Sequence, residues 1–257
     1  MIPKIIHYCW FGRNPKPFLV KKCIRSWKKY CKEYKIIEWN ENNFIIKNAP
    51  AYVRQAYKAQ KWAFVTDYVR LFVLYKYGGI YLDSDVEVIK PLDGFLKHKG
   101  FSGFEQEFSV PTGIMASEKK HPLILEWISE YKEKNFILSD GSYNLETNVE
   151  AITNSMILHG LRLDNSFQII SDYAFYPKDY FCPKSYNDGY IYLTKNTHVI
   201  HHFAGSWKTS KERKDYKRTI FRKRIEKWSR PIKEKTKYLI GEKNYHKFKL
   251  VIKKIIN

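Results

Sequence analysis

Two aspartates separated by one residue, Asp83 and Asp85, are the strongest chemical feature of the sequence. They follow the apolar run 80–82, a predicted buried strand, and side chains two positions apart in an extended segment point to the same side. Their carboxylates can therefore share a hard divalent cation, which commonly binds one or two carboxylates together with substrate phosphates. A solvated acidic turn is the alternative interpretation of such a motif.

A second pair of charged residues precedes this strand. Asp67 and Arg70 lie three positions apart in a predicted helix, so their side chains share one face. The neighbouring positions are mostly apolar, which indicates that the pair is partly buried and serves a purpose. The alternative is a surface ion pair, which contributes little to stability.

Late in the sequence, His201 and His202 precede Gly205 and Trp207. A histidine beside carboxylates can complete a metal site, and an indole N–H can donate to a phosphate oxygen. Because successive side chains of a strand face opposite sides, only one of the two histidines faces the site, and the sequence leaves open which one. Trp10, at the end of the first predicted strand, can stack on a nucleotide base or lie in the core.

The elements that must position these residues alternate between strands and helices. Strands are predicted over 2–11, 34–39, 80–82, 86–89 and 197–203, helices over 18–31, 59–77, 122–134 and 146–160, and irregular structure with short strands over 167–192. The pair Gly78 and Gly79 is typical of a helix C-terminal cap. The alternation predicts an α/β domain, in which ligands collect beyond the carboxyl ends of the strands.

The composition excludes a disordered chain and separates a body from a basic tail. The 257 residues are 44% hydrophobic and carry a formal net charge of +20, but residues 208–257 hold 19 basic and 5 acidic residues, a net +14. We expect two parts, a catalytic domain over 1–207 and a basic helical tail over 208–257 with breaks at Pro231 and Gly241. A nucleic-acid-binding domain normally carries its charge on the folded binding face, so a nucleic-acid partner is disfavoured.

The cysteines and the N-terminus point to a reducing compartment. The four cysteines form no CxxC pair, so neither a zinc knuckle nor a disulfide framework is indicated. The first residues lack the apolar core of a signal peptide, and no stretch reaches the roughly 18 consecutive apolar residues of a membrane span. We therefore expect a protein that is made and kept inside the cell.

Four motifs, in order along residues 2–207, together resemble the DXD-containing sugar transferases of glycosyltransferase family 32. They are Ile2-Pro3-Lys4-Ile5-Ile6-His7 with Trp10-Phe11-Gly12, Ala63-x-x-x-Asp67-x-x-Arg70, Tyr77-Gly78-Gly79-Ile80-Tyr81-Leu82-Asp83-Ser84-Asp85, and His201-His202-Phe203-x-Gly205-Ser206-Trp207. The resemblance implies a GT-A fold, in which a mixed nucleotide-sugar-binding sheet is flanked by helices. It also implies a nucleotide-sugar donor, Mn²⁺ or Mg²⁺, and retention of the anomeric configuration.

The resemblance gives roles to individual residues of the first three motifs. Trp10 matches the aromatic side chain that stacks on the nucleotide base. Asp67 and Arg70 match the pair that holds the donor-sugar hydroxyls. Asp83 and Asp85 match the carboxylates that contact ribose, metal and pyrophosphate.

The last motif and the middle of the chain supply the remaining candidates. His202 matches the late metal ligand by its spacing to Trp207, which itself matches the indole at the leaving phosphate, although His201 stays open as the ligand. Asn148 and Glu150 are both candidates for the residue near the anomeric carbon, with Asn148 preferred. A retaining mechanism without an enzyme nucleophile needs neither.

We therefore predict a retaining, metal-dependent hexosyltransferase that uses a nucleotide sugar, with UDP favoured, and a glycan acceptor carried on a lipid. The predicted setting is the synthesis of a bacterial surface polysaccharide such as a capsule. Apolar residues at helical spacing among lysines over 245–256 predict an amphipathic helix on an anionic membrane, and hence a peripheral location at the inner face of the plasma membrane. The alternative for the tail is a solvated basic helix packed on the domain.

Three other functions compete with this prediction. A toxin-like protein glycosyltransferase keeps the chemistry and changes the acceptor. A basic nucleic-acid-binding module leaves the aspartates and the histidine motif unexplained. An aspartate-nucleophile phosphohydrolase also has an Asp-x-Asp after a strand, but its motif lies on the first strand and has Thr or Val where this chain has Glu87.

Overall fold

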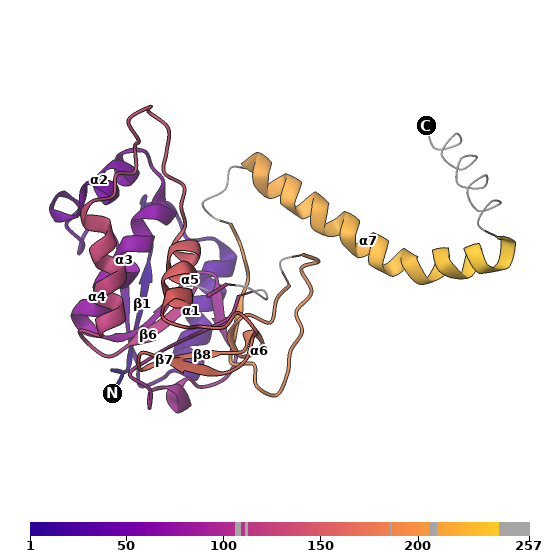
Figure 1. Cartoon of the computed structure of the whole chain (residues 1–257), viewed down its shortest axis with the longest axis horizontal. Helices are drawn as coiled ribbons and strands as arrows, with labels where there is room; N and C mark the ends of the chain where they lie inside the picture. The colour runs from indigo at the N-terminus through magenta and orange to yellow at the C-terminus, as the bar shows by residue number, and fades with distance from the viewer. Residues whose placement is uncertain (106–108, 111–112, 186, 206–209, 242–257) are drawn as a thin grey trace. The chain divides into compact units, whose positions relative to one another are not determined.

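The computed structural model describes residues 1–105, 109–110, 113–185, 187–205 and 210–241 (Figure 1). The chain divides into two compact units. The first comprises Met1–Ser185 and Tyr190–Trp207, and the second comprises Tyr186–Gly189 and Lys208–Asn257.

The first unit contains all of the strands and most of the helices in the described residues. Its strands are β1 (Ile5–Cys9), β2 (Lys35–Trp39), β3 (Gly79–Leu82), β4 (Val86–Val88), β5 (Gly100–Gly103), β6 (Ile114–Ser117), β7 (Gln168–Ile170), β8 (Tyr173–Tyr176) and β9 (Val199–His201). Its α-helices are α1 (Phe18–Tyr30), α2 (Ala51–Lys58), α3 (Trp62–Tyr77), α4 (Pro122–Ser129), α5 (Asn148–Leu158) and α6 (Lys178–Phe181). Single 3₁₀ turns lie at Ile46–Asn48, Asp93–Phe95 and Glu130–Lys132.

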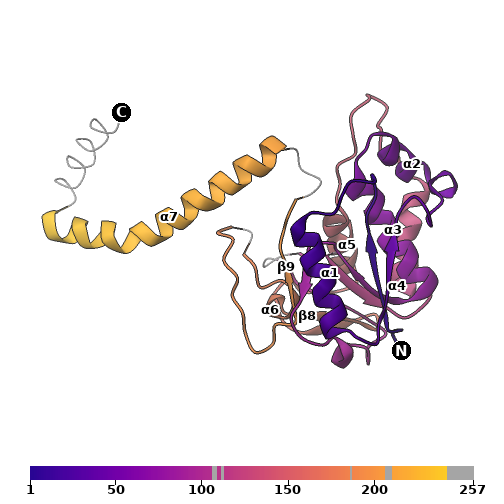
Figure 2. The same ribbon diagram turned by 180° about the vertical axis from the view of Figure 1, so that it is seen from behind.

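The strands form a mixed sheet flanked by helices. Seven strands follow the order β2-β1-β3-β6-β5-β8-β7, and β4 and β9 make a separate pair. β1 is parallel to β2 and β3, whereas β6 is antiparallel to both β3 and β5. α3, α4 and α5 lie in front of the sheet in Figure 1, and α1 lies in front of it in the reverse view of Figure 2. The predicted α/β architecture, a mixed sheet with helices on its faces, is confirmed.

Strand β3 runs through the middle of this core and is buried along its whole length. Tyr81 belongs to the hydrophobic cluster that contains α3, whereas Ile80 and Leu82 belong to the cluster that contains Trp27 of α1. This alternation follows from the two-residue repeat of a strand covered on both faces. The residues after β3 are therefore fixed from both sides of the sheet.

The turn that leads into β3 is held by a buried histidine. Gly78 caps α3, and both Gly78 and Gly79 have positive φ angles, of 67° and 111°, which glycine adopts without strain. The Nε2–H of His7 donates to the Gly78 carbonyl oxygen at 2.8 Å, and its Nδ1 accepts from Trp39 Nε1 at 3.0 Å. Burial lowers the pKa of His7 to about 4, so its imidazole is neutral at pH 7.

Several predicted elements differ from those observed. The single helix predicted over 59–77 is wrong at its start, because α3 begins at Trp62 after a break in which Gln60 has a φ of 55°, and a separate helix, α2, precedes it. Strands β5 and β6 were not expected. The predicted break at Pro231 is also wrong, since this proline lies inside α7 (Ser210–Ile240). A proline removes one backbone hydrogen bond and can bend a helix without ending it.

In its described residues, the second unit consists of α7 and a short turn that packs on it. Arg224 of α7 donates from Nε to the Asp188 carbonyl oxygen and from Nη2 to the Gly189 carbonyl oxygen, both at 2.7 Å. The amphipathic segment predicted over 245–256 lies outside the described residues. Among the described residues, no helix combines the length and the apolar character needed to cross a bilayer.

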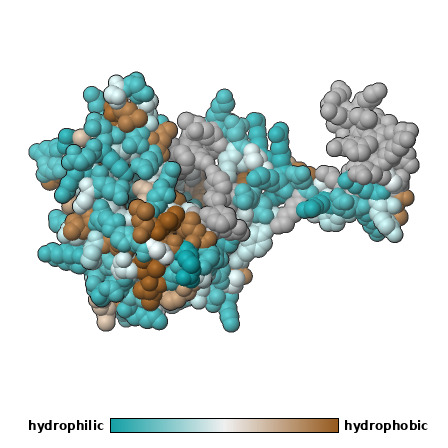
Figure 3. All heavy atoms as spheres, in the orientation of Figure 1, coloured by the Kyte–Doolittle hydropathy of each residue, from teal (hydrophilic) through white to brown (hydrophobic). Residues whose placement is uncertain are grey.

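Hydrophobic residues gather in a patch on the surface of the first unit. Figure 3 shows it on the face turned toward the viewer, over α5. Ile157 and Leu158, at the end of α5, are exposed, Leu158 to 89%. Most of the remaining surface of this face is hydrophilic.

Candidate active site

The turn after β3 fixes the backbone of the two aspartates. Asp83 N–H donates to the Gly113 carbonyl oxygen at 2.8 Å, and Val86 N–H donates to the Asp83 carbonyl oxygen at 2.9 Å. The Ala204 N–H donates to Asp85 Oδ2 at 2.6 Å. Asp83 and Asp85 therefore lie in a tight turn beyond the carboxyl end of β3, as the sequence predicts.

Arg70 of α3 connects the two acidic motifs. Its Nη2 lies 3.0 Å from Asp67 Oδ1 and 3.3 Å from Asp83 Oδ1, and its side chain is only 5% exposed. The guanidinium carbon is 4.8 Å from the centre of the Tyr81 ring, and the Tyr81 hydroxyl donates to Asp83 Oδ1 at 3.1 Å. The predicted burial of the Asp67–Arg70 pair is confirmed, and the pair is joined to the DXD turn.

Charge balance in this buried group depends on Arg70. Burial raises the pKa of Asp67 to about 6, and the neighbouring guanidinium opposes that rise. Burial also disfavours the charged guanidinium, but the carboxylates of Asp83 and Asp67 outweigh this effect and raise the pKa of Arg70. Arg70 is therefore a permanent positive charge between two carboxylates.

His201 lies beside the aspartates. It ends β9, where antiparallel pairing sets it opposite Val86 of β4, and its Nε2 is 3.5 Å from Asp85 Oδ1 and 4.0 Å from Asp83 Oδ2. Burial opposes protonation of His201, but the Asp85 carboxylate raises the pKa of His201 well above its ordinary value. Burial raises the pKa of Asp85, but the interaction with His201 outweighs burial and lowers this pKa to about 2.

The predicted metal ligand, His202, does not lie with the two aspartates. Its Nε2 lies 2.8 Å from Oε2 of Glu87, which also pairs with Lys22 Nζ at 2.7 Å. Neighbouring side chains of a strand point to opposite sides, so the pairing of β9 with β4 turns His201 toward the aspartates and His202 away from them.

Asn148, a predicted catalytic residue, is hydrogen-bonded to other parts of the protein. It is the first residue of α5, where it is buried, and its Nδ2 donates to the Asp67 carbonyl oxygen at 2.7 Å. Its Oδ1 accepts from the Tyr131 hydroxyl at 2.6 Å. Both ends of the amide are thus bonded within the protein, and Asn148 fixes α5 to α3. The other candidate, Glu150, is exposed.

Of the two tryptophans predicted to contact the donor, the structure describes only Trp10. Trp10 follows β1, so it lies at the same edge of the sheet as the turn after the parallel strand β3. Its ring is partly exposed, and its Nε1 donates to the Asn14 carbonyl oxygen at 2.7 Å. Trp207 lies outside the described residues.

Gly113 is a site residue that the sequence did not reveal. A Cβ atom added to it would lie 2.9 Å from Cε1 and Nδ1 of His201 and 3.4 Å from Oδ2 of Asp83. Only glycine allows this backbone to pack against both side chains. The role of Gly113 depends on its tertiary contact with His201 of β9, and no local pattern in the sequence indicates that contact.

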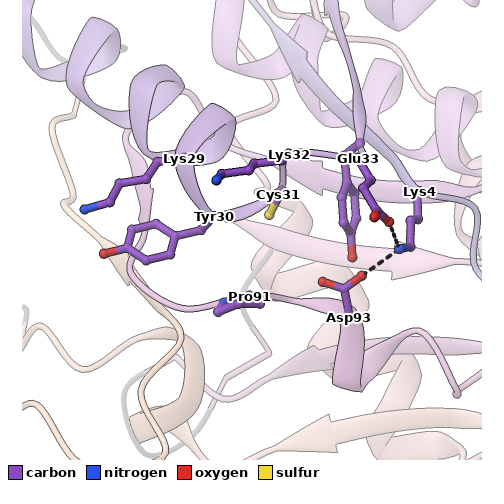
Figure 4. Close-up of a pocket in the computed structure, with 9 residues that line it drawn as sticks. Lys4, Lys29, Tyr30, Cys31, Lys32, Glu33, Pro91 and Asp93 are labelled. Carbon is purple, nitrogen blue, oxygen red and sulfur yellow. Dashed lines mark hydrogen bonds and ion pairs between the residues drawn. The ribbon is translucent and has the colours of Figure 1, made fainter.

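The pocket shown in Figure 4 lies away from this cluster. It has a volume of about 470 Å³ and is lined by residues at the amino ends of β1 and β2, including Lys4 and Tyr34. Lys4 Nζ bridges Glu33 and Asp93 at 2.5 and 3.0 Å. Because the aspartates follow the carboxyl end of a strand parallel to β1, the pocket and the DXD turn lie at opposite edges of the sheet.

The cluster around the DXD turn has the chemistry of a divalent-cation site. Asp83, Asp85 and His201 each offer one ligand atom, and these atoms lie within 4.8 Å of one another. Two carboxylates and an imidazole are an oxygen and nitrogen ligand set that suits Mn²⁺ and, with water, Mg²⁺. The residues present therefore fit the ion that the resemblance implies.

Comparisons with known proteins identify the region around this turn. Residues 17–102 match the family model described as the glycosyltransferase sugar-binding region containing the DXD motif. The chain is 31% identical over 135 residues to inositol phosphoceramide mannosyltransferase 3 of Schizosaccharomyces pombe, a match that covers 49% of this chain and 36% of that protein. It is 29% identical over 146 residues to a mannosyl phosphorylinositol ceramide synthase of Saccharomyces cerevisiae, covering 54% of this chain and 38% of the relative.

The chain therefore spans less than half the length of these curated relatives. Among solved structures, a chain titled PaToxG glycosyltransferase has a TM-score of 0.43 and 22% identity, with 61% of this chain and 69% of that chain covered.

Proposed function

We propose that this chain is a glycosyltransferase with a DXD-containing sugar-binding region, and that it transfers a hexosyl residue from a nucleotide sugar to a glycan acceptor. The observation that carries the proposal is the convergence of Asp83, Asp85 and His201 beyond the carboxyl end of β3. This edge of an α/β sheet is where such folds bind their ligands.

The donor diphosphate would be held through a divalent ion on these three side chains. When bound, Mn²⁺ or Mg²⁺ supplies positive charge against the diphosphate oxygens as the glycosidic bond breaks. Asp83 and Asp85 supply carboxylate oxygens and His201 supplies an imidazole nitrogen. The turn hydrogen bonds to Gly113 and Ala204 hold these ligands in place before the donor arrives.

Arg70 acts on the donor site through the carboxylates. It holds the Oδ1 atoms of Asp67 and Asp83 at 3.0 and 3.3 Å, so it sets the distance between the sugar-binding aspartate of α3 and the DXD turn. The proposed role of Asp67 is to accept a hydrogen bond from a donor-sugar hydroxyl. Trp10 is proposed to stack on the nucleotide base and Trp207 to donate to the leaving phosphate, with UDP as the favoured nucleotide.

The proposed reaction retains the anomeric configuration without an enzyme nucleophile. The acceptor hydroxyl attacks the anomeric carbon on the face of the departing phosphate, its proton passes to a leaving-phosphate oxygen, and the new glycosidic bond replaces the old one. The two hydrogen bonds that hold the amide of Asn148 support this version, because they leave that side chain a structural role.

A lipid-linked glycan is the proposed acceptor, and a bacterial surface polysaccharide the proposed product. The names of the relatives, which are mannosyltransferases of inositol phosphoceramide, support an acceptor carried on a lipid. The net +14 of residues 208–257 supports an anionic membrane surface as partner, at the inner face of the plasma membrane. Exposed Phe221 and Trp228 of α7 supply apolar side chains for the lipid boundary.

Vesicle flotation of the full chain tests the membrane part. We expect binding to vesicles with anionic lipid and little binding to zwitterionic vesicles. The double substitution Phe221→Ser and Trp228→Ser should weaken the anionic binding. Equal binding to both vesicle types would contradict the proposed membrane partner.

A panel of nucleotide sugars with Mn²⁺ tests the central activity. Donor hydrolysis is measured without acceptor for the wild type and for Asp85→Asn, with Asp172→Asn as a control at an exposed aspartate that pairs with Lys99 at the surface. We expect hydrolysis of one donor, its loss in Asp85→Asn and its retention in the control. Metal-independent hydrolysis by Asp85→Asn would contradict the proposal.

A further inference from the structure

A second group of ligating side chains surrounds His201. Glu105, which follows β5, and Cys182, which follows α6, each offer one ligand atom that lies within 4.8 Å of an imidazole nitrogen of His201 and of the other. None of the sequence motifs contains Glu105 or Cys182. Three chain segments that are far apart in sequence thus bring an oxygen, a sulfur and a nitrogen ligand together.

The state of these side chains is suited to binding a ligand. Cys182 is a free cysteine whose side chain is buried, with 4% of the residue exposed. The Nε2 atom of His201 faces the two aspartates, and its Nδ1 atom is buried with no hydrogen-bond partner among the described residues. A buried polar atom without a partner costs free energy, so a bound ion at this imidazole would remove that cost.

The ligand set selects a different class of ion from that of the DXD turn. A thiolate is a soft ligand that favours Zn²⁺ over Mg²⁺ and Mn²⁺, and zinc accepts cysteine, histidine and carboxylate ligands together. Ligands of a tetrahedral zinc at about 2.0–2.3 Å lie roughly 3.3–3.8 Å from one another. The observed separations, which reach at most 4.8 Å, must therefore shrink by up to about 1.5 Å, and the three residues leave the fourth position to water.

We propose that Glu105, Cys182 and His201 form a zinc-binding site that inhibits the enzyme by withdrawing His201 from the ion at the DXD turn. A neutral imidazole has one nitrogen lone pair to give, so His201 serves one of the two ions at a time. As the zinc–sulfur and zinc–nitrogen bonds form, the thiol proton of Cys182 and the extra proton of the His201 imidazolium pass to buffer, and no electron is transferred. The inhibitory effect rests on the proposed glycosyl transfer, whereas the zinc site itself does not.

Zinc binding to the full chain tests the site directly. Calorimetric titration with Zn²⁺ alone, in two buffers of different ionisation enthalpy, gives the affinity and the number of protons released. We expect Cys182→Ser to weaken binding at least tenfold and to lose the proton that comes from the thiol. Cys31→Ser is the matched control, because Cys31 is also a free, buried cysteine and lies at the end of α1, beside the pocket of Figure 4.

A titration with Co²⁺ detects the metal–thiolate bond itself, so its result does not depend on small effects of the substitutions on folding. Co²⁺ bound to a thiolate shows a sulfur-to-metal charge-transfer absorption, which we expect in the wild type and in Cys31→Ser but not in Cys182→Ser. Glu105→Gln should keep this absorption and weaken the affinity. Wild-type zinc affinity in Cys182→Ser would overturn the proposal, because the ion would then be bound by the aspartates.

The inhibitory effect has its own readout. Zn²⁺ should inhibit Mn²⁺-supported donor hydrolysis of the wild type, with relief by excess Mn²⁺, and Cys182→Ser should hydrolyse the donor normally while resisting Zn²⁺. Equal inhibition of both proteins would overturn the regulatory role. Thiol-dependent zinc binding without any donor hydrolysis would support the site and contradict the proposed transferase function.

Discussion

The buried histidine of β1 predicts a specific loss of stability in mild acid. His7 is neutral in the folded protein, where burial lowers its pKa to about 4, whereas in the unfolded chain its pKa is about 6.5. The unfolded chain therefore takes up the proton first as the pH falls. The stability that neutral His7 contributes is complete above pH 6.5 and is lost progressively as the pH falls toward 4.

The size of this loss follows from the two pKa values. Between pH 7 and pH 5 the proton taken up by unfolded His7 lowers the free energy of unfolding by about 2 kcal/mol, and the full difference below pH 4 is about 3 kcal/mol. Protonation of His7 weakens the turn before β3. A protonated ring still donates to the Gly78 carbonyl oxygen, but it can no longer accept the hydrogen bond from Trp39.

Urea denaturation at pH 7 and pH 5 measures the effect, with tryptophan fluorescence as the signal. His7→Gln should be less stable than the wild type at pH 7, since glutamine replaces the two hydrogen bonds imperfectly. The difference between the two proteins should shrink by about 2 kcal/mol at pH 5, because the variant has no imidazole to protonate and all other groups titrate in both. The same difference at both pH values would refute the reasoning.

Three further substitutions test the positions of side chains around the DXD turn. Arg70→Lys keeps the charge but cannot hold two carboxylates in a fixed plane, so kcat for donor hydrolysis should fall about 100-fold with an unchanged circular dichroism spectrum. Gly113→Ala should displace the ring of His201 and weaken Mn²⁺ binding about tenfold in a calorimetric titration, and unchanged affinity would contradict the packing described. Asn148→Ala removes two buried hydrogen bonds and should lower the free energy of unfolding by about 2–3 kcal/mol in urea; a fully stable variant with no activity would instead indicate a catalytic amide.

The residues next to β3 could be predicted because local patterns determine them. An apolar helix face, a glycine pair and a short apolar run are enough to locate α3, its cap and β3, and the two-residue repeat then sets Asp83 and Asp85 on one side. The burial of Asp67 and Arg70 followed from their apolar neighbours in the same helix. All of these signals lie within about one helix and one strand.

The features that the sequence did not reveal depend on contacts between distant segments. The choice between His201 and His202 is made by the register of β9 against β4, which local alternation leaves open. Strand β5 begins and ends with glycine, a residue depleted in strands, and Gly100 is required there because a Cβ atom would lie 2.3 Å from the ring of Tyr173. Cys182 gave no signal because a single cysteine has no spacing to interpret.

His201, with the two aspartates of the DXD turn, is proposed to hold the ion that supports donor cleavage. Mn²⁺ affinity and Mn²⁺-supported donor hydrolysis of His201→Ala and His202→Ala test it most directly, since the two variants remove the same side chain from adjacent positions. The structure predicts that His201→Ala loses at least tenfold in Mn²⁺ affinity together with most of the hydrolysis, while His202→Ala stays close to the wild type in affinity. The reverse pattern, or equal losses in both variants, would contradict the account.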